Sequence, residues 1–229
     1  MKDFSILQDK LEIKFNNREL LIQALCHRSY INENTNFRMG HNERLEFLGD
    51  AVLELVVTEH LYNKYPKKNE GDLTTWRAAL VNTKTLSELS KEIGIEDFIL
   101  LSRGEGKAMG RTKQSILADT LEALIGAIYL DSGYLLCKNF IEKNLISKLP
   151  RILKLGLHID SKSRFQEEAQ SREKITPSYK VINELGPDHE KTFTVGIYIG
   201  DRLITKGEGL SKQEAEEEAA RRGLEIMKW

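Results

Sequence analysis

The chain has 229 residues, of which 40% are hydrophobic and 30% charged, a balance typical of folded globular proteins and not of disordered or fibrous ones. This length suits one large domain or two ordinary ones. The 34 basic and 35 acidic residues give a net charge of −1, so the chain has no general basic excess and any nucleic-acid-binding surface must be a local patch.

The sequence also bears on the compartment of the protein. No apolar run approaches the roughly 18 residues of a membrane-spanning helix, and the first ten residues lack the apolar core of a signal peptide. The two cysteines, Cys26 and Cys137, lie far apart within helical patterns, which offers neither a disulfide framework nor a zinc site. We therefore expect a cytoplasmic protein without membrane contact.

The first two thirds of the chain carry the apolar spacing of α-helices. Leu, Ile and Ala recur at i, i+3 and i+4, and short turns rich in Gly, Asn and Lys separate the periodic segments. The spacing predicts helices over residues 5–24, 43–63, 72–93, 114–130 and 133–149. Residues 1–150 are thus predicted to form an all-α domain, and residues 151–159, which show neither helical nor strand periodicity, a linker.

Residues 160–229 have a different, mixed pattern. The predicted elements are a helix through Phe165 and Ala169, strands near 179–185, 192–199 and 202–205, and a helix that a capping box opens at Ser211. Gly200 and Asp201 form the two-residue turn between the second and third strands. The order α-β-β-β-α indicates a small α+β domain.

Acidic residues interrupt the apolar pattern of residues 42–57. At about 100° per residue, Glu43, Glu46 and Asp50 fall within an arc of about 60° on a helix that is otherwise apolar on nearly every side and is expected to be largely buried. Buried carboxylates are costly unless they are paired or bind a cation. Gly49 costs about 1 kcal/mol relative to Ala inside a helix, and it lets another backbone or a ligand approach beside Asp50.

The segment 115–128 repeats this feature. Its only charges are Asp119 and Glu122, which are three residues apart and so share one face. Two buried helices that both present acids to the interior favour one shared site. A carboxylate cluster without His or Cys is an oxygen-only ligand set that suits Mg²⁺ or Mn²⁺. Such ions can activate water and stabilise the leaving oxygen in phosphodiester hydrolysis.

Other interpretations of these acids remain open. A single Glu on a helix is more often solvated or salt-bridged than a metal ligand, and Glu54, near the same face, is interpreted in that way. Arg44 can neutralise one acid but not four. A di-iron bundle requires Glu-x-x-His pairs, whereas this chain has Glu-x-x-Glu and Asp-x-x-Glu.

At these residues the chain resembles bacterial ribonuclease III. Residues 42–53 match the signature helix of that family, with Ala51 where the family often has Ser, and residues 117–127 resemble its second acidic motif. Residues 160–227 resemble the double-stranded-RNA-binding domain that comes after it in the family. The resemblance implies an all-α endonuclease domain over 1–150 and an RNA-binding domain over 160–229.

The resemblance also implies roles for the acids. The implied divalent-metal site consists of Glu46, Asp50, Asp119 and Glu122. Asp50 and Glu122 are its implied catalytic residues. Glu43 stands where the family has an acid linked to the dimer interface and substrate positioning, and Phe47 where an aromatic ring packs across the dimer, although a core Phe is equally compatible with the sequence. The family is a homodimer that cuts both strands of duplex RNA, leaves 5′-phosphate and 3′-hydroxyl ends, and needs no small-molecule cofactor.

A glycine-rich loop precedes the second acidic motif. It carries Arg103, Lys107, Arg111 and Lys113 among three glycines. We interpret this loop as a strap that contacts phosphates beside the acidic site. A solvated connection is the alternative.

The RNA-binding domain has three expected contact regions. Proteins recognise duplex RNA by its shape, phosphates and 2′-hydroxyls, and the resemblance places Gln166, the loop at His189 and Lys212 at these contacts. Lys212 also stands at a helix N-terminus, where the helix dipole favours phosphate. The sequence departs from the family after Lys212, because the last helix continues Gln213-Glu214-Ala215-Glu216-Glu217-Glu218 where family members usually carry several basic residues.

This acidic helix puts tight, autonomous RNA binding by the domain in doubt. Residues 151–229 hold 14 basic and 14 acidic side chains, a net charge of zero. The alternative is that Glu216, Glu217 and Glu218 face solvent and hardly matter.

The sequence as a whole predicts a dimeric endoribonuclease of double-stranded RNA that uses Mg²⁺, for which Mn²⁺ can substitute. We expect it to process rRNA precursors and other structured transcripts, including mRNA and tRNA precursors. The alternative is a non-catalytic double-stranded-RNA-binding or processing-scaffold protein on the same fold. The presence of all four acids favours the enzyme.

Overall fold

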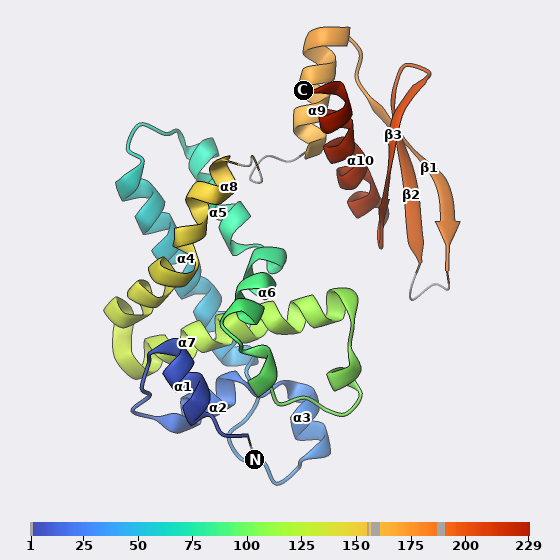
Figure 1. Ribbon diagram of the computed structural model, residues 1–229. Coiled ribbons are helices and arrows are strands. Elements are labelled where there is room, and N and C mark those ends of the chain that lie inside the picture. The colour runs from blue at the N-terminus through green and yellow to red at the C-terminus, as the bar shows by residue number, and fades with distance from the viewer. Residues whose placement is uncertain (1, 155, 157–160, 187–190) are drawn as a thin grey trace. The chain divides into compact units, whose positions relative to one another are not determined.

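The computed structural model describes every residue except 1, 155, 157–160 and 187–190. The chain divides into two compact units, Met1–His158 and Ile159–Trp229 (Figure 1). The first is built of helices, and the second combines helices with one antiparallel sheet. The fold class predicted from the sequence is therefore confirmed.

The N-terminal unit contains helices of very different length. Its α-helices are α1 (Ser5–Leu11), α2 (Arg18–Ala24), α3 (Arg28–Glu33), α4 (Glu43–Lys64), α5 (Glu70–Val81), α6 (Thr83–Glu92), α7 (Gly110–Asn144) and α8 (Leu149–Lys154). Short 3₁₀ turns lie at η1 (Glu96–Phe98), η2 (Glu105–Lys107) and η3 (Ile146–Lys148). Two predicted helices are each divided in two, because Asn17 and Asn82 act as N-caps whose side-chain oxygens accept N–H groups of the next turn at 3.0 and 2.9 Å.

Helices α4 and α7 cross at the centre of this unit (Figure 1). Two glycines make the crossing possible. A Cβ atom at Gly49 would lie 1.7 Å from the carbonyl oxygen of Glu122, and a Cβ atom at Gly126 would lie 2.2 Å from that of Leu45. Only glycine therefore permits this backbone approach, and the approach that the sequence expected beside Asp50 is made by the α7 backbone.

Helix α7 is broken at Gly133, whose φ of 78° and ψ of −179° lie outside the helical region. The break falls at the first residue of the second of the two helices that the sequence predicts over 114–130 and 133–149. Beyond it the chain returns to α4. The Tyr134 hydroxyl donates a hydrogen bond to Glu59, and His60 Nδ1 lies 3.3 Å from a Glu142 carboxylate oxygen. Helix α7 thus contacts α4 on both sides of the break.

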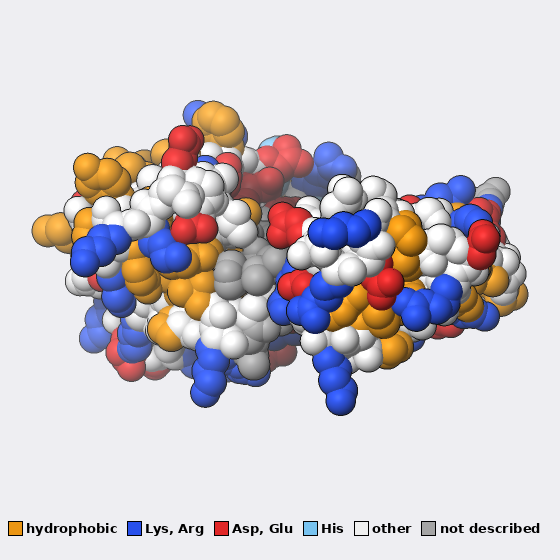
Figure 2. Space-filling model, turned by 90° about the horizontal axis from the view of Figure 1, so that it is seen from above, with side chains coloured by type: hydrophobic (Ala, Val, Ile, Leu, Met, Phe, Trp, Pro, Cys, Tyr) orange, Lys and Arg blue, Asp and Glu red, His pale blue; other side chains and the backbone are white. Residues whose placement is uncertain are grey.

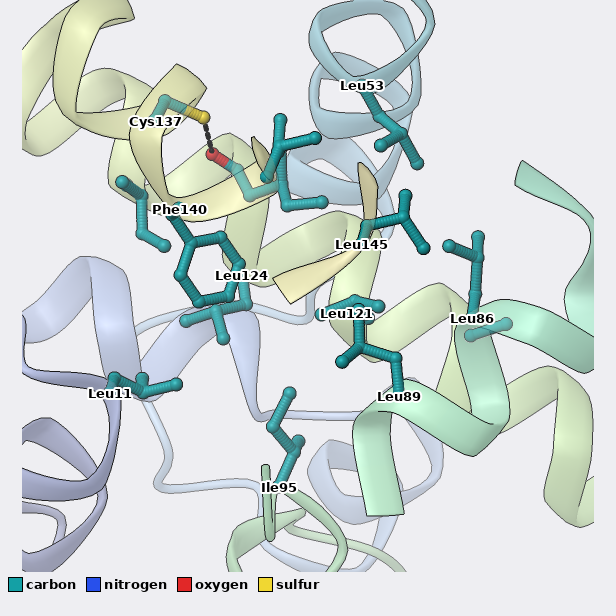
Figure 3. Packing of buried hydrophobic residues seen from close by; sticks show 14 of the residues in the cluster. Leu11, Leu53, Leu86, Leu89, Ile95, Leu121, Leu124, Cys137, Phe140 and Leu145 are labelled. Carbon is teal, nitrogen blue, oxygen red and sulfur yellow. Dashed lines mark hydrogen bonds between the residues drawn. The ribbon is translucent and has the colours of Figure 1, made fainter. Parts of the chain in front are cut away.

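The hydrophobic core surrounds this crossing. Side chains from several helices converge on α7, including Leu53, Leu86, Leu121 and Phe140, and the Cys137 thiol donates to the carbonyl oxygen of Ile125 at 3.5 Å (Figure 3). The composition of α7 corrects the expectation that no segment of the chain is long and apolar enough to span a membrane. By length and composition alone, the span Gly110–Lys154 would suffice to cross a membrane. Half of the most apolar 18-residue stretch of this span is buried inside the protein, as in the core helix of a globular domain.

The C-terminal unit has the predicted order α-β-β-β-α. Its elements are α9 (Ser161–Glu173), β1 (Ser178–Leu185), β2 (Thr192–Ile199), β3 (Arg202–Gly209) and α10 (Lys212–Met227). The strands pair antiparallel in the order β1-β2-β3, and both helices lie on one face of the sheet (Figure 1). Ile199 pairs with Arg202, so Gly200 and Asp201 form the predicted two-residue turn. A small core forms around Phe165, Ile197 and Ala219.

Candidate active site and RNA-binding surface

The glycine contact between α4 and α7 brings the acids of the two helices together. Glu46, Asp119 and Glu122 are half-buried, and each offers a carboxylate oxygen within 4.8 Å of the other two. Asp50, one turn after Glu46 on α4, is exposed and lies outside this group of three. Two helices therefore supply one acidic cluster, the arrangement that the sequence predicts for its shared site.

Burial and mutual repulsion perturb these carboxyl groups. Burial raises the pKa of Glu122 to about 8, with the charges of Asp50, Asp119 and Glu46 acting in the same direction. Burial, and after it the neighbouring acids, also raises the pKa of Glu46, and burial raises the pKa of Asp119, where the His27 imidazole opposes the rise. Glu122 therefore holds a proton at neutral pH unless a cation replaces it.

The donor chemistry of the cluster suits a hard divalent cation. All three groups are carboxylates, and hard ions such as Mg²⁺ and Mn²⁺ prefer oxygen ligands. A bound cation would relieve both causes of the raised pKa values, because it attracts the charges that otherwise repel one another. The residues present fit a divalent metal.

Glu43 is the first residue of α4, and its carboxylate has different partners from those of the acidic cluster. Its carboxylate lies 3.5 Å from an Arg28 nitrogen and 3.7 Å from His41 Nδ1. It is exposed and does not join the group of three. It does contribute to the raised pKa of Glu46 through its charge.

A stripe of exposed residues runs along α4 on another side. Phe47 is 82% exposed, Leu55 57% and Tyr62 73%, and Ala51 and Thr58 between them are exposed as well. The core alternative for Phe47 is therefore wrong. So is the expectation that α4 is buried on nearly every side. The spacing 47, 51, 55, 58, 62 is the regular i, i+4, i+7 pattern of one helix face, which could have indicated this surface from the sequence.

The glycine-rich loop begins after the bridge between Cys26 and Leu100. Arg103, Lys107 and Arg111 are exposed, whereas Lys113 is half-buried and forms an ion pair with Glu96. Three of the four predicted phosphate-contacting cations are thus accessible to a large ligand, and Arg111 and Lys113 lie in the first turn of α7.

In the C-terminal unit the predicted RNA contacts lie on separate elements. Gln166 is exposed on α9, and Lys212 is exposed in the first turn of α10, where its Nζ lies 3.4 Å from Glu184 and 5.6 Å from the Phe193 ring centroid. His189 lies outside the described residues.

Ion pairs within the C-terminal unit neutralise several of the acidic side chains of α10. Lys162 of α9 contacts Glu216 at 2.6 Å, and Arg221 and Arg222 both bind Glu218. Glu217 alone of the three predicted surface acids is exposed. On the face shown in Figure 2, acidic and basic side chains are interspersed, so the charges in view form no large patch of one sign.

The residues around His27 were not predicted from the sequence. His27 is the N-cap of α3, and its Nδ1 accepts the Ser29 N–H at 3.3 Å. Its pKa is lowered by burial, while Glu105 and Asp119 act in the opposite direction. Helix α3 has only six residues and falls between the predicted helices, so no periodicity marked it.

Comparisons with known proteins agree with this architecture. Residues 17–149 match the family model described as Ribonuclease-III-like, and residues 161–227 match that of the double-stranded RNA binding motif. The chain is 46% identical to Ribonuclease 3 of Borreliella afzelii, over 96% of this chain and 89% of that protein. It is 43% identical to Ribonuclease 3 of Carboxydothermus hydrogenoformans, over 97% and 94% of the two chains.

A solved structure is similar to the N-terminal unit. The nuclease domain of ribonuclease III from Campylobacter jejuni, described as flexible in a region involved in dimer formation, is 45% identical with a TM-score of 0.55, covering 62% of this chain and 98% of that one. Two family matches in order, relatives of nearly full length and the clustered acids lead to one conclusion. The chain belongs to the ribonuclease III family and is an endoribonuclease of double-stranded RNA.

Proposed function

We propose that this endoribonuclease uses Mg²⁺, held by Glu46, Asp50, Asp119 and Glu122. The observation that carries the proposal is the half-buried cluster of Glu46, Asp119 and Glu122, to which nearby Asp50 adds its charge. When bound, Mg²⁺ supplies activation of water and stabilisation of the leaving oxygen in phosphodiester hydrolysis. Mn²⁺ has the same preference for oxygen ligands and should substitute.

The protein's own groups have distinct tasks in this site. Glu122 would give up its proton on binding a cation, because its pKa of about 8 otherwise keeps it protonated at neutral pH. Asp50 is exposed, whereas the other three acids are half-buried, so Asp50 is the acid of this set most accessible to a substrate. We assign Asp50 and Glu122 as the catalytic pair, with 5′-phosphate and 3′-hydroxyl products.

We further propose that the enzyme acts as a homodimer through the exposed stripe of α4. A two-fold axis near Leu55 would pair the α4 helices of two copies in antiparallel orientation. Phe47 of one copy would then lie against position 62 or 63 of the other, because these positions lie about eight residues from Leu55 on opposite sides. Tyr62 and Asn63 line a cavity of about 700 Å³ together with Tyr65 and Leu73. A ring from the second copy fits such a cavity, and a two-fold dimer suits a duplex whose strands are related by approximate two-fold symmetry.

The duplex would contact both units of the chain. In the nuclease unit, the basic residues Arg103, Lys107, Arg111 and Lys113 would contact phosphates, and Glu43 would help to position the substrate. In the RNA-binding unit, Gln166, His189 and Lys212 would reach phosphates and 2′-hydroxyls.

The biological setting is inferred from the activity. We propose processing of rRNA precursors and other structured transcripts in the cytoplasm. Cys26 and Cys137 are both free and buried, as suits a reducing compartment.

Cleavage of a long duplex RNA tests the metal proposal. Purified full-length protein should cut the duplex with Mg²⁺ or Mn²⁺ and should not cut it after chelation. The Glu122→Gln variant, which keeps the side-chain volume, should bind the duplex without cutting it. Binding without cutting by the wild-type protein under every metal condition would instead support the non-catalytic scaffold.

A further inference from the structure

The glycine-rich loop is held mainly by hydrogen bonds. We call residues 102–110 the strap. From Arg103 to Gly110 its residues are exposed or half-buried, and a cavity of about 340 Å³ is lined both by strap residues and by core residues such as Ile116 and Leu117. Side-chain packing alone therefore does not fix where the strap lies.

Two side chains of α3 bind the beginning of the strap. The Ser29 hydroxyl oxygen accepts the Ser102 N–H at 3.1 Å, and the Glu33 carboxylate accepts the Arg103 N–H at 3.1 and 3.3 Å. Ser102 extends this order into the loop, because its own hydroxyl oxygen accepts the Glu105 N–H at 3.1 Å. The anchor thus reaches the turn η2 that carries Lys107.

Ser29 is itself held in one orientation. His27 Nδ1 accepts the Ser29 N–H, so this nitrogen carries a lone pair, and the Ser29 hydroxyl lies 2.8 Å from the same atom. The hydroxyl proton is therefore directed to His27, which leaves the oxygen lone pairs available to Ser102. This alternation of donor and acceptor defines a single chain of hydrogen bonds from His27 to the strap.

The same short segment is tied to the acid-bearing helix. The N–H of Asn42, the buried N-cap of α4, donates to the carbonyl oxygen of Cys26 at 2.9 Å. Arg28 lies 3.5 Å from Glu43 in the first turn of α4. The segment from Cys26 to Ser29 therefore connects the strap to the beginning of α4.

We propose that Ser29 is a positioning residue that keeps the strap cations Arg103 and Lys107 at a fixed place relative to α4, so that they meet duplex phosphates next to the acidic cluster. The inference rests on the proposed RNA-contacting role of the strap. Ser29 itself touches neither RNA nor metal. It acts through Ser102, and Glu33 supports it as a second anchor.

The test compares Ser29→Ala with wild type in the full-length enzyme on a short duplex RNA. Removal of one anchoring hydrogen bond should raise KM about three- to tenfold and leave kcat within about twofold. The slope of log KM against log salt should become shallower by about 0.7–0.9 for each phosphate that the strap no longer binds. Ser29→Thr should restore both values, because it keeps the hydroxyl. A purely structural role would lower the melting temperature without changing the salt slope, and that result overturns the proposal.

Matched variants separate this inference from its foundation. Ser147→Ala, which removes a hydroxyl bonded to the Lys143 carbonyl oxygen away from the strap, should match wild type. Arg103→Ala with Lys107→Ala tests the strap itself, and an unchanged KM there would refute both the strap's role and its anchoring. A raised KM in that double variant but not in Ser29→Ala would refute the anchoring alone.

Two further results decide the route by which Ser29 acts. Ser29→Ala added to the double strap variant should cause little additional change, because the cations it positions are already absent. A full additional effect, or a fall in kcat with altered Mg²⁺ dependence, would place its action elsewhere and overturn the proposal. If Ser29→Ala unfolds, Glu33→Ala removes the other anchor from an exposed position and must raise KM in the same way.

Discussion

Gly49 of α4 and Glu122 of α7 are in backbone contact, and a single methyl group at Gly49 would lie 1.7 Å from the Glu122 carbonyl oxygen. This contact sets the distance between the helices that carry the acids. The acidic cluster therefore depends on a residue that has no side chain and no charge.

Replacement of Gly49 tests this dependence. Gly49→Ala should push α4 and α7 apart, reduce cleavage by at least about 100-fold through misplaced ligands, and lower the free energy of unfolding by about 1–3 kcal/mol through overpacking. Cleavage rates and thermal melting measure the two effects. Gly71→Ala, where a Cβ would meet only the Asn69 side chain at 3.3 Å, is the control and should be nearly silent. Activity close to wild type in Gly49→Ala would show that the site tolerates a wider crossing.

The Glu122→Gln variant should separate catalysis from binding and from stability. We expect cleavage to be abolished, duplex affinity to stay within about twofold, and the metal-free protein to gain about 1 kcal/mol, because a neutral amide replaces a crowded carboxyl group. Thermal melting with and without Mg²⁺ measures the effect on stability. The variant should lose most of the stabilisation that Mg²⁺ gives the wild type. Cleavage within tenfold of wild type would remove Glu122 from the metal site.

The pH dependence of the metal-free protein depends on the same group. The pKa of Glu122 rises from 4.5 to about 8 on folding, so between these values the folded state binds more protons than the unfolded state. The contribution of Glu122 to stability should therefore be greatest below about pH 4.5 and should fall as the pH rises to about 8. Urea unfolding at several pH values, compared with Glu122→Gln, isolates this contribution. An identical pH profile in the two proteins would contradict it.

Mg²⁺ binding should release a proton below about pH 8, the pKa of Glu122. Because the ion needs the ionised carboxylate, its apparent affinity should strengthen about tenfold per pH unit in that range if one proton is displaced. Calorimetry in two buffers of different ionisation enthalpy measures the proton directly. Equal heats in both buffers would mean that Glu122 does not take part.

Phe47→Ala should affect assembly and not folding. The ring is 82% exposed in a single chain, so its removal costs the monomer little, whereas a ring buried in the cavity of a second copy would cost the dimer about 3–5 kcal/mol. Sedimentation over a range of concentrations should show dissociation. Glu88→Ala, an exposed change on α6, is the control. An unchanged dimer would exclude Phe47 from the interface.

Two lysines on α10 should strengthen RNA binding. Gln213 and Glu217 are both exposed, and their side chains are hydrogen-bonded to each other at 3.2 Å, so Gln213→Lys with Glu217→Lys adds cations without breaking a bond between elements. In a Glu122→Gln background, duplex affinity should rise and the salt slope should steepen by about 0.7–0.9 for each of the two lysines that meets a phosphate. Unchanged affinity and slope would mean that this face of α10 does not meet the duplex.

The sequence alone leads to a different choice for that experiment. Gln213 and Glu216 are the positions that the family resemblance recommends, but Glu216 is bound to Lys162 of α9. A lysine there would repel Lys162 and damage the packing of the domain. Helical periodicity places Glu216 on a face, but only the tertiary structure reveals its partner on another helix.

The same distinction explains which features of the site were predictable. The acids of α4 and α7 could be found because charges within apolar helices are conspicuous, and Gly49 because glycine is unfavourable in a helix. Ser29 could not, since its importance comes from a partner 73 residues away. Phe47 was ambiguous for another reason, because an apolar stripe looks the same in a sequence whether its own chain or a second copy covers it.

The break at Gly133 lets one helix hold another at two separate points. Before it, α7 meets α4 backbone to backbone at Gly49, and after it, Tyr134 binds Glu59, about 15 Å farther along α4. Two contacts at that spacing oppose both sliding and rotation of α4 against α7. A single contact would not prevent rotation. The alignment of the acids therefore depends partly on Tyr134, which is remote from every one of them. Loss of the contact between Tyr134 and Glu59 should weaken metal binding.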